Sequence, residues 1–217
     1  PPLQPTPTSN PGFATIMVEA LRKIDPMRAH GAWIYLCTSI AAGALIGGND
    51  RVEPAMLVGT SFAGAFLAVA GIAVSIQRKR RQIVSGLGMA IFATIGALAL
   101  HTNPHYLLVV SLAAILATVT IMLARRLGYL AHSTMLVGVA ALALAAPASA
   151  VAGGATFARA AMLFFLLWSF YSWRTFLVAG EFAAGNCTAT QLRGRGLREA
   201  AVAALWALAV VIVLQIF

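Results

Sequence analysis

The sequence predicts an all-α fold, a polytopic transmembrane bundle of about seven spans. Of its 217 residues, 60% are hydrophobic and only 10% are charged, and the mean hydropathy is +0.87. A soluble domain carries about a quarter charged residues, so this chain has too little polar material to cover a globular surface. The basic residues also fall in short clusters between long apolar runs, a pattern typical of multi-pass membrane proteins.

The first 30 residues precede the predicted spans. Residues 1–12, Pro1 to Gly12, are rich in proline, serine and threonine, which predicts an extended tail without regular structure. We expect another membrane-protein subunit to contact this tail. In residues 13–30, apolar side chains recur at helical spacing opposite Glu19, Arg22 and Lys23, which predicts an amphipathic helix at the membrane interface.

A bilayer core needs about 20 apolar residues per helix. Runs of about this length form the predicted bundle of residues 31–217, and they cover residues 31–48, 55–76, 83–101, 106–124, 128–152, 157–178 and 199–217. Pro147 lies inside the fifth run. We expect it to kink or end that helix, because proline lacks the backbone N–H and its ring clashes with the preceding turn.

The distribution of basic residues predicts the orientation. With a cytoplasmic N-terminus, 13 Lys and Arg residues fall on the inner side, while only Arg51 and Arg159 fall outside. This asymmetry follows the positive-inside rule and places the C-terminus outside. Because the basic residues are spread over separate loops, the net charge of +9 does not indicate a nucleic-acid partner.

The acidic residues exclude several kinds of chemistry. No Asp or Glu occurs between residues 54 and 180. Membrane transferases that bind Mg²⁺ need paired carboxylates, and proton pumps usually need one in mid-membrane. The four histidines, His30, His101, His105 and His132, fall at predicted helix ends, which favours interfacial polar groups over haem ligands. We therefore expect no metal site and no required cofactor.

The sixth span is rich in aromatic residues, among them Trp168, Tyr171 and Trp173. If its helix continues, Tyr171, Arg174 and Glu181 share one face, where Arg174 either binds an anionic head group or pairs with Glu181. One interpretation is a contact surface for lipid, quinone, pigment or another subunit. The alternative is an aromatic belt at the inner interface with a snorkelling arginine.

Two further patterns suggest contacts with lipid and between helices. The loop Arg78, Lys79, Arg80 and Arg81 either determines topology alone or also binds anionic lipid head groups. Small residues recur at helical spacing on the second and third spans, and they predict close packing within the chain or against a partner. The main positions are Gly64, Ala68, Gly71, Gly86 and Ala90.

The tetrapeptide His30-Gly31-Ala32-Trp33 and the later segment Trp168 to Thr175 resemble the YwiC-like family of bacterial polytopic membrane proteins. The likeness covers about residues 26–217 and implies a bacterial inner-membrane location. Carried over by position, His30, Trp33, Arg174 and Glu181 would meet near the inner face. The family pattern has an acidic residue before the histidine, where this chain has Ala29. If that acid pairs with the histidine in relatives, this chain keeps the scaffold and loses the activity.

Three functional hypotheses follow. The first is a non-catalytic integral subunit or accessory factor of a larger membrane complex, of electron transport or photosynthesis. The second is an enzyme or carrier for a lipid-soluble substrate at the cytoplasmic face, using His30 and Arg174. The third is a haem-binding membrane subunit, in which either His30 and His132 face each other or His101 and His105 act with a partner.

Overall fold

The computed structural model describes residues 30–48, 52–74, 80–100, 104–128, 131–183 and 189–216, and these segments contain helices and short turns but no strand. The helices are α2 (His30–Gly47), α3 (Val52–Val74), α4 (Arg80–Leu100), α5 (Pro104–Leu127), α6 (His132–Ala143), α7 (Ala145–Ala152), α8 (Phe157–Ala183) and α9 (Ala189–Ile216). The predicted all-α class is confirmed. The tail of residues 1–12, and the predicted interfacial helix apart from its last residue, lie outside the described residues.

Four stretches of the chain are long and apolar enough to cross a membrane: His105–Leu127, His132–Ala152, Phe157–Glu181 and Arg198–Ile216. Shorter apolar helices cover Gly31–Gly47, Glu53–Val69 and Ile83–Ile95. The chain is therefore a multi-pass membrane protein. The count of seven spans and the inward N-terminus stay predictions, because length and composition decide neither.

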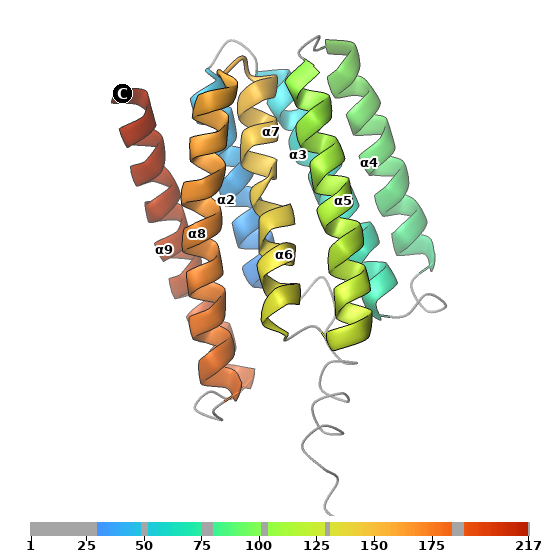
Figure 1. Ribbon diagram of the computed structural model, residues 1–217, viewed down its shortest axis with the longest axis vertical. Helices are drawn as coiled ribbons and strands as arrows, with labels where there is room; N and C mark the ends of the chain where they lie inside the picture. Colours follow the sequence, from blue (N-terminus) through green and yellow to red (C-terminus); the bar gives the residue numbers. More distant parts are fainter. Residues whose placement is uncertain are drawn as a thin grey trace, which may run out of the picture.

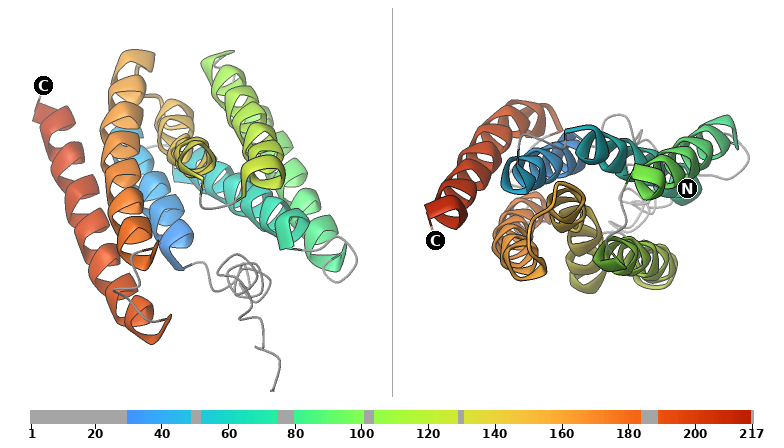
Figure 2. Two further views of the ribbon diagram at one scale, coloured as in Figure 1. Left: turned by 60° about the horizontal axis from the view of Figure 1, so that its bottom comes forward. Right: turned by 90° about the horizontal axis from the view of Figure 1, so that it is seen from above.

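The helices stand side by side in a bundle (Figure 1). Seen along the bundle, α9, α2, α3 and α4 form one layer, and α8, α6, α7 and α5 form the other (Figure 2). The start of α2 and the ends of α5 and α8 lie at one end of the bundle, while α9 ends at the opposite end (Figure 1). Exposed Arg125 and Arg126 lie in the last turn of α5, at the first of these ends.

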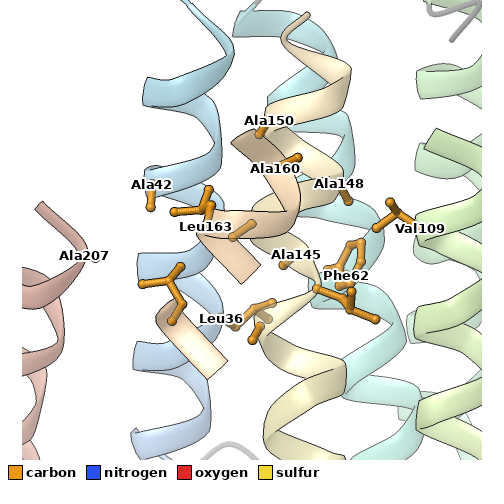
Figure 3. Packing of buried hydrophobic residues seen from close by; sticks show 14 of the residues in the cluster. Leu36, Ala42, Phe62, Val109, Ala145, Ala148, Ala150, Ala160, Leu163 and Ala207 are labelled. Atoms are coloured by element: carbon orange, nitrogen blue, oxygen red, sulfur yellow. The ribbon is translucent and has the colours of Figure 1, made fainter. Parts of the chain in front are cut away.

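The predicted fifth span is broken into α6 and α7 at Leu144. Pro147 explains the position of the break, because its missing N–H would have donated to the carbonyl of Ala143 and its ring crowds that carbonyl. All eight residues of α7 are buried. They contribute to a core of small and branched side chains that includes Leu36, Ala145 and Leu163 (Figure 3).

Glycines allow α2 to touch α7. A Cβ at Gly43 would lie 2.2 Å from the carbonyl oxygen of Ala146, and one at Gly47 would lie 2.7 Å from the Cα of Gly153. Both contacts are shorter than any real Cβ contact, so only glycine fits. Since lipid is as apolar as the core, such close backbone packing is a main source of helix association in a membrane.

A second close contact joins α3 and α4. A Cβ on Gly64 would lie 2.7 Å from the backbone of both Gly86 and Ala90, and one on Gly86 would lie 2.8 Å from the nitrogen of Ala68. The structure thus brings together four of the five small residues selected from the sequence, and it does so within the chain. The fifth, Gly71, lies on α3, but its contacts are not described.

Candidate functional site

Tyr171 occupies the middle of the candidate site. It lies on α8 with its side chain fully buried, and its ring stacks on that of Tyr35 from α2, with centroids 4.3 Å apart and planes 10° apart. Its hydroxyl lies 2.7 Å from Oγ1 of Thr38. Because the Thr38 hydroxyl donates to the carbonyl of Ile34, the Tyr171 hydroxyl is the donor in this pair.

Arg174 lies one helical turn further along α8 and pairs with Glu199 of α9. Its Nε donates to Oε2 of Glu199 at 2.8 Å, and its Nη2 donates to Oε1 of the same carboxylate. Such a bidentate pair combines two charge-assisted hydrogen bonds with a defined geometry. The guanidinium also lies 5.7 Å from the ring centroid of Trp173, which adds a cation–π contact.

These five side chains, Tyr35, Thr38, Tyr171, Arg174 and Glu199, are called the α2–α8–α9 polar cluster. They join three helices that are far apart in the sequence. Two further hydrogen bonds attach α9: Trp206 Nε1 donates to the carbonyl of Leu166 on α8, and the Gln215 amide donates to the carbonyl of Leu45 on α2. Polar contacts therefore run along the length of α9.

The residues predicted for an inner-face site have different described neighbours. Tyr171 and Arg174 belong to the polar cluster, but the Trp33 ring packs edge-on against Phe66 of α3 at 4.9 Å. The carboxylate that pairs with Arg174 is that of Glu199, where the sequence suggested Glu181. Glu181 lies half-buried near the end of α8. His30 begins α2, and its side chain lies outside the described residues.

The other predicted positions divide between described and undescribed parts of the chain. Arg78 and Lys79 lie outside the described residues, and Arg80 and Arg81 begin α4 with side chains that are not described. In the described helices the ring of His132 lies against Phe176, with centroids 5.3 Å apart. No group of three or more His, Cys, Asp or Glu side chains in these helices is arranged to hold a metal ion.

Aromatic residues of α8 form a ladder on the surface of the bundle. Phe164 stacks on Trp168 with centroids 5.8 Å apart, and Phe170 stacks on Trp206 of α9 at 4.9 Å. Phe165 and Trp173 are exposed, at 57% and 56%. This surface can accept an apolar ligand, acyl chains or another helix.

Sequence reasoning missed Tyr35, Thr38 and Glu199 as members of the cluster. A signal for Glu199 was present, because it is one of six acidic residues and opens an apolar segment on the same predicted side as Arg174. A charge within a membrane helix usually has a partner on a neighbouring helix. Tyr35 and Thr38 carry no comparable signal, since only the rotation of α2 turns them toward α8.

Comparison with known proteins gives one match. Residues 27–150 match the model of a family described as YwiC-like protein. This range includes α2 to α6 and most of α7, with the close contact between α2 and α7, whereas α8 and α9 lie beyond it. No curated protein and no solved structure matches the chain.

Proposed function

Because the chain belongs to the YwiC-like family, we propose that it acts as a non-catalytic integral subunit or accessory factor of a larger complex in the bacterial inner membrane. Electron-transport and photosynthetic complexes are the hosts to test first. The proposal treats the bundle as a scaffold whose polar groups hold its own helices together and whose outer faces and N-terminal tail contact partner subunits.

The observation that carries this proposal is the pairing within the α2–α8–α9 polar cluster. An enzyme needs polar groups that are free to engage a substrate, whereas Arg174 gives two hydrogen bonds to Glu199 and Tyr171 gives its hydroxyl hydrogen to Thr38. Breaking this partly buried charge pair costs about 2 kcal/mol, the usual scale for hydrogen bonds to charged groups. A substrate that displaced Glu199 would have to offset that free energy. A structural role for the Arg174–Glu199 pair is therefore the simpler one.

The uneven burial of the spans also supports the proposal. In the most apolar stretch of α5, only 11% of residues are buried within the chain, compared with 67% in the segment that contains α6 and α7. Large apolar side chains of α5, such as Leu107, Leu108 and Ile115, face outward. A helix attached along so narrow a contact has most of its surface available to a partner subunit or to lipid.

The test is isolation of the protein from its native membrane in a mild detergent. Native mass spectrometry and size-exclusion chromatography should show the chain in a stoichiometric complex with other membrane proteins. Truncation of residues 1–12 should weaken that complex without changing the thermal unfolding midpoint of the isolated chain. A monodisperse species of 22.6 kDa plus detergent, with no partner, would contradict the proposal.

One observation favours a second candidate, a carrier for a lipid-soluble substrate. Carriers often place broken helices at their binding sites, and the α6–α7 break lies in the centre of this bundle. This candidate requires Arg174 to exchange Glu199 for the substrate. His30→Ala and Arg174→Ala should then abolish transport while folded yield is retained, and Arg159→Ala, an exposed arginine at the other end of α8, is the matched control.

A further inference from the structure

The turn between α5 and α6 brings two arginines to the start of a helix. Arg125 and Arg126 are exposed in the last turn of α5, and neither guanidinium has an acidic partner among the described residues. Gly128, with a φ of 89°, turns the chain, and its carbonyl accepts a hydrogen bond from the N–H of Ala131, the N-cap residue of α6. The two arginines therefore lie close to the N-terminus of α6.

The first turn of α6 has backbone donors without acceptors. Its N-cap residue, Ala131, makes no side-chain capping bond, and the helical bonds begin with the N–H of Met135 donating to the Ala131 carbonyl. The N–H groups of His132, Ser133 and Thr134 thus have no acceptor within the helix. The start of a helix also carries the positive end of its dipole, and both features favour an anion there.

A buried hydroxyl in the same turn also lacks a partner. Thr134 is 3% exposed, and its Oγ1 has no hydrogen-bond partner among the described residues, which is unusual for a buried hydroxyl. Thr134 lies one turn before Gly138, whose Cβ position is 3.3 Å from Cγ2 of Thr120, so it faces α5 and leans toward the start of α6. In this antiparallel register Thr134 lies level with Ala124, directly before the two arginines.

An apolar stripe on α5 leads away from these polar groups. Met122 and Ile115 are exposed and lie four and eleven residues before Arg126, so the three share one face of the helix. Eleven residues of helix rise about 16 Å, which is about half the thickness of a bilayer core. An acyl chain that follows this stripe through one leaflet has its head group at the arginines.

We propose that the α5–α6 turn binds the phosphate of an anionic phospholipid whose acyl chains lie along α5. Arg125 and Arg126 supply the opposite charge, while the uncapped N–H groups of α6 and the Thr134 hydroxyl donate hydrogen bonds to phosphate oxygens. The apolar stripe beside the arginines favours a lipid over soluble phosphate. Neither helix carries an acidic residue that would repel the ligand.

The experiment uses the full chain, purified in detergent and titrated with phosphatidylglycerol or with phosphatidylcholine of identical acyl chains. Native mass spectrometry counts bound lipid, and the unfolding midpoint reports binding to the folded state. We expect phosphatidylglycerol to bind saturably and at least tenfold more tightly than phosphatidylcholine. Inorganic phosphate at the same concentration should leave the midpoint unchanged. An effect of phosphate equal to that of phosphatidylglycerol would overturn the lipid as the ligand.

Substitutions of the arginines locate the site. The double variant Arg125→Gln/Arg126→Gln should weaken phosphatidylglycerol binding at least tenfold, because it removes the charge that attracts the phosphate. Arg159→Gln, at an exposed arginine near the start of α8, should bind as the native chain does. Equal affinity for the two lipids in the native chain, or native affinity in the double variant, overturns the proposal.

The Thr134 hydroxyl separates lipid binding from folding. Thr134→Val keeps the side-chain shape and removes a buried hydroxyl without a partner, so the unfolding midpoint without lipid should not fall. Phosphatidylglycerol binding should still weaken at least threefold, while Thr60→Val, at an exposed threonine of α3, leaves it unchanged. Native affinity in Thr134→Val would exclude this hydroxyl and overturn the geometry proposed for the phosphate. Since the isolated chain is used, the result is independent of whether the proposed membrane complex exists.

Discussion

At the scale of single residues, the polar side chains of this bundle connect helices that are distant in the sequence. Arg174 and Glu199 are separated by 25 positions, and Thr38 and Tyr171 by 133. In a membrane, where apolar contacts with lipid compete with those between helices, each such hydrogen bond favours one pairing of helices over others. These residues therefore define specific arrangements of α2, α8 and α9.

Removing the Glu199 charge should destabilise the bundle. Glu199→Gln leaves the Arg174 guanidinium partly buried, at 24% exposure, without its carboxylate. We expect a loss of about 2 kcal/mol in unfolding free energy, the usual scale for hydrogen bonds to charged groups. Denaturant titration in mixed micelles measures it. Glu53→Gln, at an exposed acid of α3, should cost less than about 1 kcal/mol. Equal losses in the two variants would show that the ion pair contributes nothing specific.

The hydroxyl of Tyr171 should contribute separately from its ring. Tyr171→Phe keeps the stack on Tyr35 and removes the hydrogen bond to Thr38, so we expect a loss of about 1 kcal/mol. A double-mutant cycle with Thr38→Val isolates the coupling. Thr60→Val is the control, because Thr60 bonds only to a carbonyl of its own helix. Additive effects of Tyr171→Phe and Thr38→Val would contradict the hydrogen bond.

At the scale of elements, the bundle is organised around α7. This helix of eight residues is buried on all sides, and small residues on both α2 and α7 permit their contact. Helices α3 and α4 make the same kind of close backbone contact, at Gly64 and Gly86. Each of these glycines destabilises its helix by roughly 1 kcal/mol relative to alanine. The closer packing of the helices offsets this loss.

Three glycine-to-alanine substitutions test this packing. Gly43→Ala and Gly64→Ala place a Cβ within 2.7 Å of backbone atoms of the facing helix, so we expect losses of about 2–3 kcal/mol or failure to fold. Gly88→Ala is the matched control, because nothing lies within 4 Å of its Cβ position on α4. It should be neutral or stabilise the chain by up to about 1 kcal/mol. Comparable losses in all three would contradict the packing explanation, because Gly88 has no close neighbour and helix propensity favours alanine at every one of these positions.

At the scale of the whole molecule, the two-layered bundle has its start and end on opposite sides (Figure 1). A chain whose first and last helices end on opposite sides crosses the membrane an odd number of times, if every helix of the bundle spans it. Which side is cytoplasmic stays a prediction, which rests on the 13 basic residues that the sequence places inside. The broken α6–α7 segment counts as one crossing, because α7 continues upward from α6 (Figure 1).

The orientation can be tested with reporters. Alkaline phosphatase fused after Phe217 should be active, since the predicted C-terminus is outside, and a fluorescent protein that folds only in the cytoplasm should stay dark there. Fusions after Arg126 should give the reverse pattern, because exposed Arg125 and Arg126 end α5 on the predicted inner side. Cytoplasmic behaviour at both positions would show that the number of crossings between them is even.

The sequence by itself determined the properties that depend on local composition. These are the helical membrane class, the approximate helix positions and the break caused by Pro147, because hydrophobic length and missing backbone donors act within one segment. Tertiary structure alone decided which residues meet. It pairs Arg174 with Glu199, turns Trp33 toward Phe66, and sets Gly43 against α7. In a membrane, lipid-facing and core-facing positions are equally apolar, so the rotation of each helix leaves little trace in the sequence.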